Sequence, residues 1–183
     1  MPRAGAELVI VTGGPGAGKT TLLNALAKAG FPTAEETGRA IIKDQIAISG
    51  RALPWVDPML YAETMLSWEI GSYRKCVGRK ELCFFDRGIP DVIGYLRLLG
   101  LPVPVHMRNA AAMFRYHRRV FIAPPWPEIF TQDEERKQTV EEAVRTYEAL
   151  AATYAELDYD LIEIPRCTVG ARRNFILDRV SGG

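Results

Sequence analysis

The segment from Gly13 to Thr20 reads Gly-Gly-Pro-Gly-Ala-Gly-Lys-Thr and matches the pattern G-x-x-x-x-G-K-[ST] at every constrained position. That pattern describes a phosphate-binding loop, or P-loop, whose glycines let successive backbone N–H groups turn inward around a phosphate. The motif requires a strand before it and a helix after it. Here the apolar residues 8–11 precede the loop, and an amphipathic stretch beginning at Thr21 follows it. The sequence therefore predicts that this chain binds a nucleoside triphosphate.

Each polar residue of the loop has an expected task. The Lys19 ammonium can reach the β- and γ-phosphates, and the Thr20 hydroxyl is placed to ligate Mg²⁺. The N-terminus of the following helix adds partial positive charge at the same place. ATP and Mg²⁺ are therefore the expected cofactors, and the residues expected to contact the nucleotide are Gly14, Pro15, Gly16, Ala17, Gly18, Lys19, Thr20 and Thr21.

A carboxylate ends the apolar stretch 81–86, which we expect to form a strand. In parallel α/β sheets, ligands bind at the carboxyl ends of the strands, so Asp86 is placed to face the P-loop. An acidic residue there can hold Mg²⁺ directly or through water, which makes Thr20 and Asp86 the predicted metal ligands. The alternative is that Asp86 caps the next helix. Arg87 beside it could contact the acceptor or a phosphate, or could form a structural salt bridge.

Two further carboxylates, Glu35 and Glu36, end a second predicted strand over residues 31–36. Adjacent residues of a strand point to opposite faces, so one of the two should enter the site, and we favour Glu36. Such a carboxylate could orient an attacking hydroxyl or take its proton. The alternative is an acidic pair that simply favours a helix N-terminus. Arg39, one turn on, could hold an acceptor anion or be solvated.

A polar, charged segment between the fourth predicted strand and a long helix has the character of a lid. We place this lid at residues 124–137 and assign Arg136 as the side chain that could stabilise the transferring phosphoryl group. The alternative is a solvated helix start held by ion pairs between residues three apart.

Short apolar strands alternate with helical stretches, as in a parallel α/β sheet. The chain of 183 residues reads as a single domain over 1–183, with strands expected near 7–12, 31–36, 81–86, 119–123 and 160–164. Asp57 and Pro58 are suited to begin a helix that reaches residue 77. Several apolar residues of this helix share a face, which is typical of core, although some could line an acceptor pocket: Met59, Tyr61, Met65, Trp68 and Tyr73.

The composition excludes several classes of partner. The formal net charge is +1, and no basic run alternates with aromatic residues, so we expect neither nucleic-acid nor membrane binding. The three cysteines have no C-x-x-C spacing, which favours reduced thiols. No apolar run approaches the roughly 20 residues of a membrane span, and the first predicted strand leaves no room for a signal peptide. We expect a soluble, cytoplasmic protein.

Beyond the P-loop, the segments Glu35–Arg39 and Asp86–Asp91 carry a family resemblance. With them, the chain resembles the P-loop family labelled "AAA domain" or "predicted ATPase", to which the ribosylnicotinamide kinase domain is similar. The Asp133-x-x-Arg136 segment and the ending Ile162-x-Ile164-Pro165 agree with that family. The resemblance covers nearly the whole chain. It implies the three-layer α/β fold of P-loop NTPases, with a five-stranded parallel sheet in the order 2-3-1-4-5, as in nucleotide kinases.

The leading functional hypothesis is an ATP-dependent phosphotransferase acting on a hydroxyl of a small-molecule acceptor. A phosphate on the acceptor would call for convergent arginines, and the sequence places only Arg39 and Arg87 for that role. A nucleoside-like acceptor is therefore favoured over a nucleotide. The alternative is an ATPase or nucleotide-dependent switch without such an acceptor, and a third hypothesis is a nucleotide-binding module. The absence of an Asn-Lys-x-Asp motif counts against a Ras-like GTPase. The sequence does not identify the acceptor, the choice of ATP over GTP, or the oligomeric state.

Overall fold

The computed structural model describes residues 8–129 and 139–181. Its five strands are β1 Leu8–Gly13, β2 Thr33–Ala34, β3 Cys83–Asp86, β4 Arg119–Ala123 and β5 Asp160–Glu163. The α-helices are α1 Lys19–Lys28, α2 Thr37–Ala47, α3 Pro58–Cys76, α4 Ile89–Leu98, α5 Val105–Met113, α6 Val140–Glu156 and α7 Val169–Ser181. A short 3₁₀ helix covers Pro127–Ile129.

The strands form one parallel sheet in the order β2-β3-β1-β4-β5. The order predicted from the family resemblance is thus confirmed. β1 lies at the centre between β3 and β4, and Val11 of β1 is in register with Asp86 of β3. The P-loop and Asp86 therefore emerge side by side at the carboxyl edge of the sheet, next to the point where the strand order reverses.

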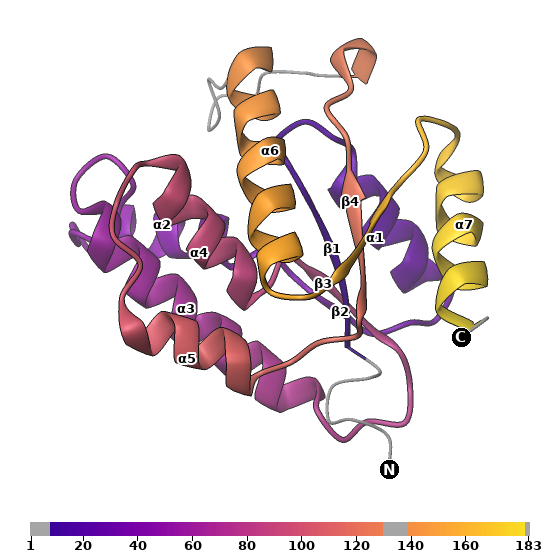
Figure 1. Cartoon of the computed structure of the whole chain (residues 1–183), viewed down its shortest axis with the longest axis horizontal. Coiled ribbons are helices and arrows are strands. Elements are labelled where there is room, and N and C mark those ends of the chain that lie inside the picture. Colours follow the sequence, from indigo (N-terminus) through magenta and orange to yellow (C-terminus); the bar gives the residue numbers. More distant parts are fainter. Residues whose placement is uncertain (1–7, 130–138, 182–183) are drawn as a thin grey trace.

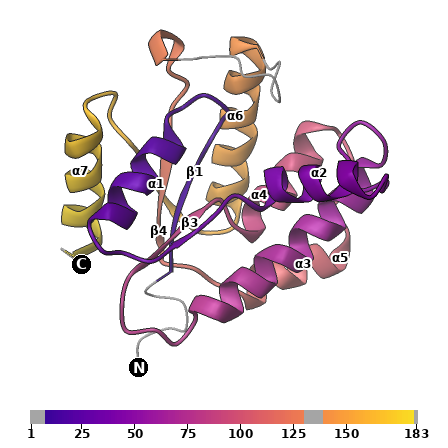
Figure 2. The ribbon, with the colours of Figure 1, turned by 180° about the vertical axis from the view of Figure 1, so that it is seen from behind.

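Helices cover both faces of the sheet and make a three-layer arrangement (Figure 1). The side chains of β1 alternate between the two faces, as the period of two in a strand requires. Leu8 and Ile10 enter the core built with α3, α4, α5 and α6. Val9 and Val11 enter the opposite core, against α1 and α7, and Figure 2 shows these two helices on their own side of the sheet.

Several predicted boundaries differ from the structure. The second strand was expected over 31–36 but is limited to Thr33–Ala34, because it is an edge strand paired with β3 alone. The helix cap at Asp57 is as expected, since its carboxylate accepts a hydrogen bond from Leu60 N at 3.0 Å. α6 begins at Val140, where the Thr139 hydroxyl and the Glu142 carboxylate cap the helix reciprocally. Arg136 and most of the predicted lid lie outside the described residues.

Within the described part of the chain, no helix is long and apolar enough to cross a membrane. All three cysteines are free thiols. Cys76 and Cys83 are buried beside one another, with 3.0 Å between their sulfur atoms, and Cys167 is partly exposed.

Candidate functional site

The P-loop leaves β1 at Gly13 and enters α1 at Lys19. Gly18 has φ 73°, in the left-handed region that favours glycine, and no side chain caps the N-terminus of α1. The first N–H groups of an α-helix have no partner within the helix and can bind an anion. At Gly14, a Cβ atom would lie 2.7 Å from the carbonyl oxygen of Ala143, so α6 packs directly against the loop.

Lys19 is buried and curls back over its own loop, where its Nζ donates to Gly14 O at 2.9 Å. Thr20 and Thr21 are exposed at the start of α1. These positions are compatible with the nucleotide-contacting roles expected of all three residues. The roles themselves remain predictions.

Asp86, at the end of β3, is a buried carboxylate beside the P-loop. Among the described residues, none forms a hydrogen bond with its buried Oδ1 atom. Burial raises the pKa of Asp86, and the positive charge of Lys19 opposes that rise. An unsatisfied oxygen of this kind suits a Mg²⁺ ligand or a metal-bound water. The described residues contain no group of three or more His, Cys, Asp or Glu side chains that could hold a metal.

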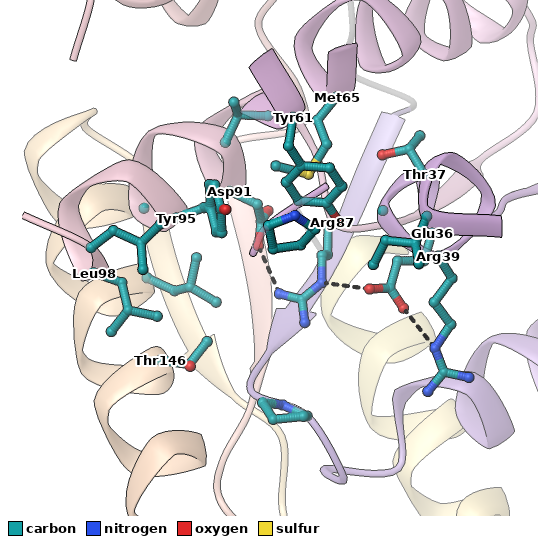
Figure 3. Close-up of a pocket in the computed structure, with 18 of the residues that line it drawn as sticks. Glu36, Thr37, Arg39, Tyr61, Met65, Arg87, Asp91, Tyr95, Leu98 and Thr146 are labelled. Atoms are coloured by element: carbon teal, nitrogen blue, oxygen red, sulfur yellow. Dashed lines mark hydrogen bonds and ion pairs between the residues drawn. The ribbon is translucent and has the colours of Figure 1, made fainter. Parts of the chain in front are cut away.

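Arg87 follows Asp86 with φ 73°, a backbone conformation that costs a non-glycine residue about 1–3 kcal/mol. Its side chain bridges two carboxylates, with Nε 3.5 Å from Glu36 Oε1 and Nη1 3.4 Å from Asp91 Oδ1 (Figure 3). Burial alone would lower the pKa of this guanidinium, but the surrounding carboxylates raise it by more. Arg87 therefore stays a cation held in one place.

The two glutamates before α2 have different surroundings. Glu36 faces inward, and its second carboxylate oxygen lies 3.9 Å from Arg39 Nε, so the carboxylate sits between two arginines. Glu35 is exposed and does not line the pocket described below. The geometry thus places Glu36, rather than Glu35, beside the P-loop.

A pocket of about 430 Å³ opens next to the P-loop and is lined by residues of α2, α3, α4 and α6. We call it the lateral pocket. Pro15 of the P-loop lines one end, and Glu36 and Arg87 line the same cavity. Its other polar contributions come from Thr37, Arg39, Glu69, Asp91, Tyr95, Glu142, Arg145 and Thr146.

The apolar part of the lateral pocket is aromatic. Tyr61 and Tyr95 pack edge to face with ring centroids 5.5 Å apart, and Met65 and Leu98 line the cavity beside them (Figure 3). The Tyr95 hydroxyl is buried and makes no hydrogen bond to any described residue. Of the apolar face predicted for α3, Tyr61 and Met65 thus line the pocket, whereas Tyr73 belongs to the core and Trp68 is largely exposed.

Asp91 organises the region behind Arg87. It is buried and accepts hydrogen bonds from Gly88 N at 2.9 Å, from the Tyr154 hydroxyl at 2.5 Å and from the Thr12 hydroxyl. These contacts join β1, the loop after β3 and α6 around one carboxylate. The second aspartate of the segment Asp86–Asp91 therefore anchors the loop that carries Arg87.

Glu69, in the middle of α3, is a residue whose importance the sequence did not reveal. It is buried, lines the lateral pocket and accepts a hydrogen bond from the Thr37 hydroxyl at 2.8 Å. Burial raises the pKa of Glu69 from 4.5 to about 8, and the hydrogen bond from Thr37 opposes part of that rise. The carboxyl group is therefore protonated in the folded protein at neutral pH.

This raised pKa predicts how stability depends on pH. Because the folded state keeps a proton that the unfolded state releases, the stability present below about pH 4.5 is lost as the pH rises toward 8. Between about pH 5 and about pH 7, the wild-type protein should lose about 2–3 kcal/mol of unfolding free energy relative to Glu69→Gln. Urea unfolding at the two pH values measures this difference. Replacing the exposed Glu148 with glutamine is the matched control, and parallel pH profiles for Glu69→Gln and the wild-type protein would contradict the prediction.

A parallel sheet in this order, with a P-loop after its central strand, defines the fold of the P-loop nucleotide kinases. Within that class the chain belongs to the AAA domain family, whose model matches residues 8–172. No match exists among curated proteins.

Solved structures similar to this chain include a NadR protein and two kinases. A NadR protein in complex with NR is 22% identical with a TM-score of 0.71, over 96% of this chain and 50% of that chain. A deoxyadenosine kinase from M. mycoides is 13% identical with a TM-score of 0.68, over 96% of this chain and all of the other. A thymidylate kinase from Ehrlichia chaffeensis is 13% identical with a TM-score of 0.65, over 97% and 99% of the two chains. At these identities the likeness establishes the fold, and this chain spans about half the length of the NadR protein.

Proposed function

We propose that this protein is an ATP-dependent phosphotransferase that phosphorylates a hydroxyl group of a small, nucleoside-like acceptor. One observation carries the proposal. A carboxylate held between two arginines, Glu36, lines a pocket of about 430 Å³ whose wall includes the P-loop residue Pro15. A pocket of that size next to the phosphate-binding loop suits a small molecule bound beside the triphosphate.

On the donor side, the loop amides from Gly14 to Thr20 and the Lys19 ammonium would hold the triphosphate, with Thr21 at the next position of the helix. Thr20 and Asp86 would hold Mg²⁺, which when bound neutralises charge on the phosphates. The buried Oδ1 of Asp86, which accepts no hydrogen bond from any residue that the structure describes, supports that assignment. The lid residue Arg136 remains a candidate for the charge on the transferring group.

On the acceptor side, Glu36 would bind the hydroxyl that attacks. The acceptor oxygen forms a bond to the γ-phosphorus, the bond from that phosphorus to the β,γ-bridging oxygen breaks, and ADP leaves. The proton of the hydroxyl passes to the Glu36 carboxylate. Because phosphoryl transfer depends on positioning more than on a strong base, the main contribution of Glu36 is to aim the oxygen in line.

The charges around Glu36 favour a neutral acceptor group beside that carboxylate over one that already carries a phosphate. Arg87 is engaged by Glu36 and Asp91, and Arg39 lies near Glu36. A dianionic phosphate would have to compete with these carboxylates for the same cations. The deoxyadenosine kinase, the NadR protein with NR and the thymidylate kinase share this fold, so the fold by itself does not choose between a nucleoside and a nucleotide.

The aromatic part of the pocket would hold the flat ring of such an acceptor, and the Tyr95 hydroxyl would pair with a polar group on it. Tyr95→Phe should weaken acceptor binding by about tenfold, since one hydrogen bond is lost. The same variant should stabilise the ligand-free protein slightly, because it removes a buried hydroxyl that has no hydrogen-bond partner among the described residues. Acceptor KM and thermal unfolding measure the two effects, with Tyr147→Phe as the control outside the pocket. An unchanged KM would show that Tyr95 does not contact the acceptor.

The function itself is tested by Mg²⁺-dependent release of ADP from ATP, first alone and then with a panel of nucleosides, nucleotides, sugars and amino alcohols. The proposal predicts a low basal rate that one class of hydroxyl compound raises strongly. A high basal rate that no compound alters would favour the ATPase or switch.

A further inference from the structure

Arg172 of α7 is a fully buried arginine whose side chain reaches the phosphate-binding loop rather than solvent. The side chain is 2% exposed, its Nη2 donates to Ala17 O at 3.1 Å, and its Nη1 donates to Gly18 O at 3.3 Å. No carboxylate among the described residues forms an ion pair with Arg172. A guanidinium buried at this depth is ordinarily paired with an anion, so the use of loop carbonyls as partners calls for an explanation.

The geometry of the peptide bond explains why Arg172 bonds to these two carbonyl groups. A trans peptide is planar, and its C=O and N–H point in opposite directions. The carbonyl of Ala17 belongs to the same peptide as the N–H of Gly18, and the carbonyl of Gly18 to the same peptide as the N–H of Lys19. By bonding to the Ala17 carbonyl, and to the Gly18 carbonyl that also accepts from Leu22 N at 3.3 Å, Arg172 helps to hold these two N–H groups on the opposite side of the loop.

The contact between Arg172 and the loop is close, and the Trp126 ring packs against the Arg172 guanidinium. A Cβ atom on Gly18 would lie 2.8 Å from Arg172 Nη1, so the guanidinium is seated directly on the loop. The Trp126 ring lies on the guanidinium with its centroid 5.5 Å from Cζ, which limits the movement of the side chain. The positive charge of Arg172 therefore sits immediately behind the place proposed for the phosphates, where it adds to the attraction for an anion.

We propose that Arg172 is a positioning residue that sets the orientation of the phosphate-binding loop and thereby its affinity for a nucleotide. This inference rests on the proposed function, because it takes the loop to bind a nucleotide. It adds Arg172 of α7, which lies outside the P-loop motif, to the residues that determine this binding. A purely structural tether between α7 and α1 is the competing explanation. It predicts lower stability without a change in nucleotide affinity.

The test compares three variants by isothermal titration with ADP and by thermal unfolding. Arg172→Met removes both donors and the charge, Arg172→Lys keeps the charge without the two-pronged geometry, and Arg173→Met is the control. The Arg173 guanidinium bonds to Asn174 instead of the loop. We expect the Kd for ADP to rise by about tenfold or more in Arg172→Met and by roughly threefold to tenfold in Arg172→Lys, with Arg173→Met unchanged. The KM for the acceptor should not change in any of them.

The outcomes separate the two explanations. Arg172 variants that are folded and bind ADP with wild-type affinity would overturn the inference, whatever their stability. Should Arg172→Met fail to fold, Arg172→Lys decides by the same criterion. If the wild-type protein bound no ADP, the proposed function would fail and the inference with it, whereas normal wild-type binding with insensitive variants would leave the proposed function standing.

Discussion

Glu36→Gln is expected to lower kcat for phosphoryl transfer by about 10²–10⁴-fold while leaving ADP binding unchanged. Glutamine has the size of glutamate but carries no negative charge. The variant therefore lacks the carboxylate that accepts the hydroxyl proton and that lies 3.5 Å from Arg87 Nε. Without that charge, the acceptor hydroxyl is neither aimed nor deprotonated. Steady-state kinetics with saturating acceptor measure the effect on kcat, and titration with ADP checks that the P-loop is unaffected.

The neighbouring residue provides a matched control. Glu35 differs from Glu36 by one position in the chain, is exposed and lies outside the lateral pocket. Glu35→Gln should retain the wild-type kcat. If the two variants were equally active, or if Glu35→Gln were the weaker enzyme, the assignment of the acceptor site to Glu36 would be wrong.

Lys19→Ala is the second change with a large expected effect. The ammonium reaches the β- and γ-phosphates in the proposed complex, and its loss should reduce kcat/KM for ATP by about 10²–10³-fold. The fold should survive, because the hydrogen bond from Lys19 Nζ to Gly14 O that the variant loses lies within the P-loop itself. Turnover of ATP and circular dichroism measure the two expectations.

Lys28, in the last turn of the same helix, is exposed and serves as the comparison for Lys19. Lys28→Ala should behave as the wild-type protein does. Full activity in a folded Lys19→Ala variant would show that the segment from Gly13 to Thr20 does not bind the triphosphate.

The central features of the fold could be predicted because they depend on strong local signals. The apolar residues 8–11 lie within β1, Asp57 caps the helix α3 that begins at Pro58, and residues 119–123 form β4. β2 was predicted too long, because pairing in an edge strand depends on its single neighbour. Glu35 and Glu36 lie beyond the last residue that pairs with β3 and leave the sheet before α2. The strand order came from the family resemblance, which the match over residues 8–172 now confirms.

The site could be predicted where a motif marks it and not where tertiary packing creates it. The P-loop follows β1, Asp86 ends β3 and Glu36 follows β2, so the topology brings these residues to the same edge of the sheet. Glu69 lies on the apolar face of α3 with Tyr61, Met65 and Tyr73, each four residues from the next. The available signal in the sequence was an acidic residue at a position of this apolar face. The raised pKa of Glu69, however, depends on burial, which only the folded structure reveals. Arg172 stands in an ordinary helical sequence, and nothing local indicates that it reaches the P-loop.

The most direct test of phosphoryl transfer is the stoichiometry of products from ATP, Mg²⁺ and the acceptor that accelerates ADP release most. Mass spectrometry would follow ADP, inorganic phosphate and the phosphorylated acceptor in the same reaction. A phosphotransferase forms one phosphorylated acceptor for each ADP, with little inorganic phosphate, and this is the expected result. Equal amounts of ADP and inorganic phosphate, with the acceptor unmodified, would contradict it and identify the protein as an ATP hydrolase.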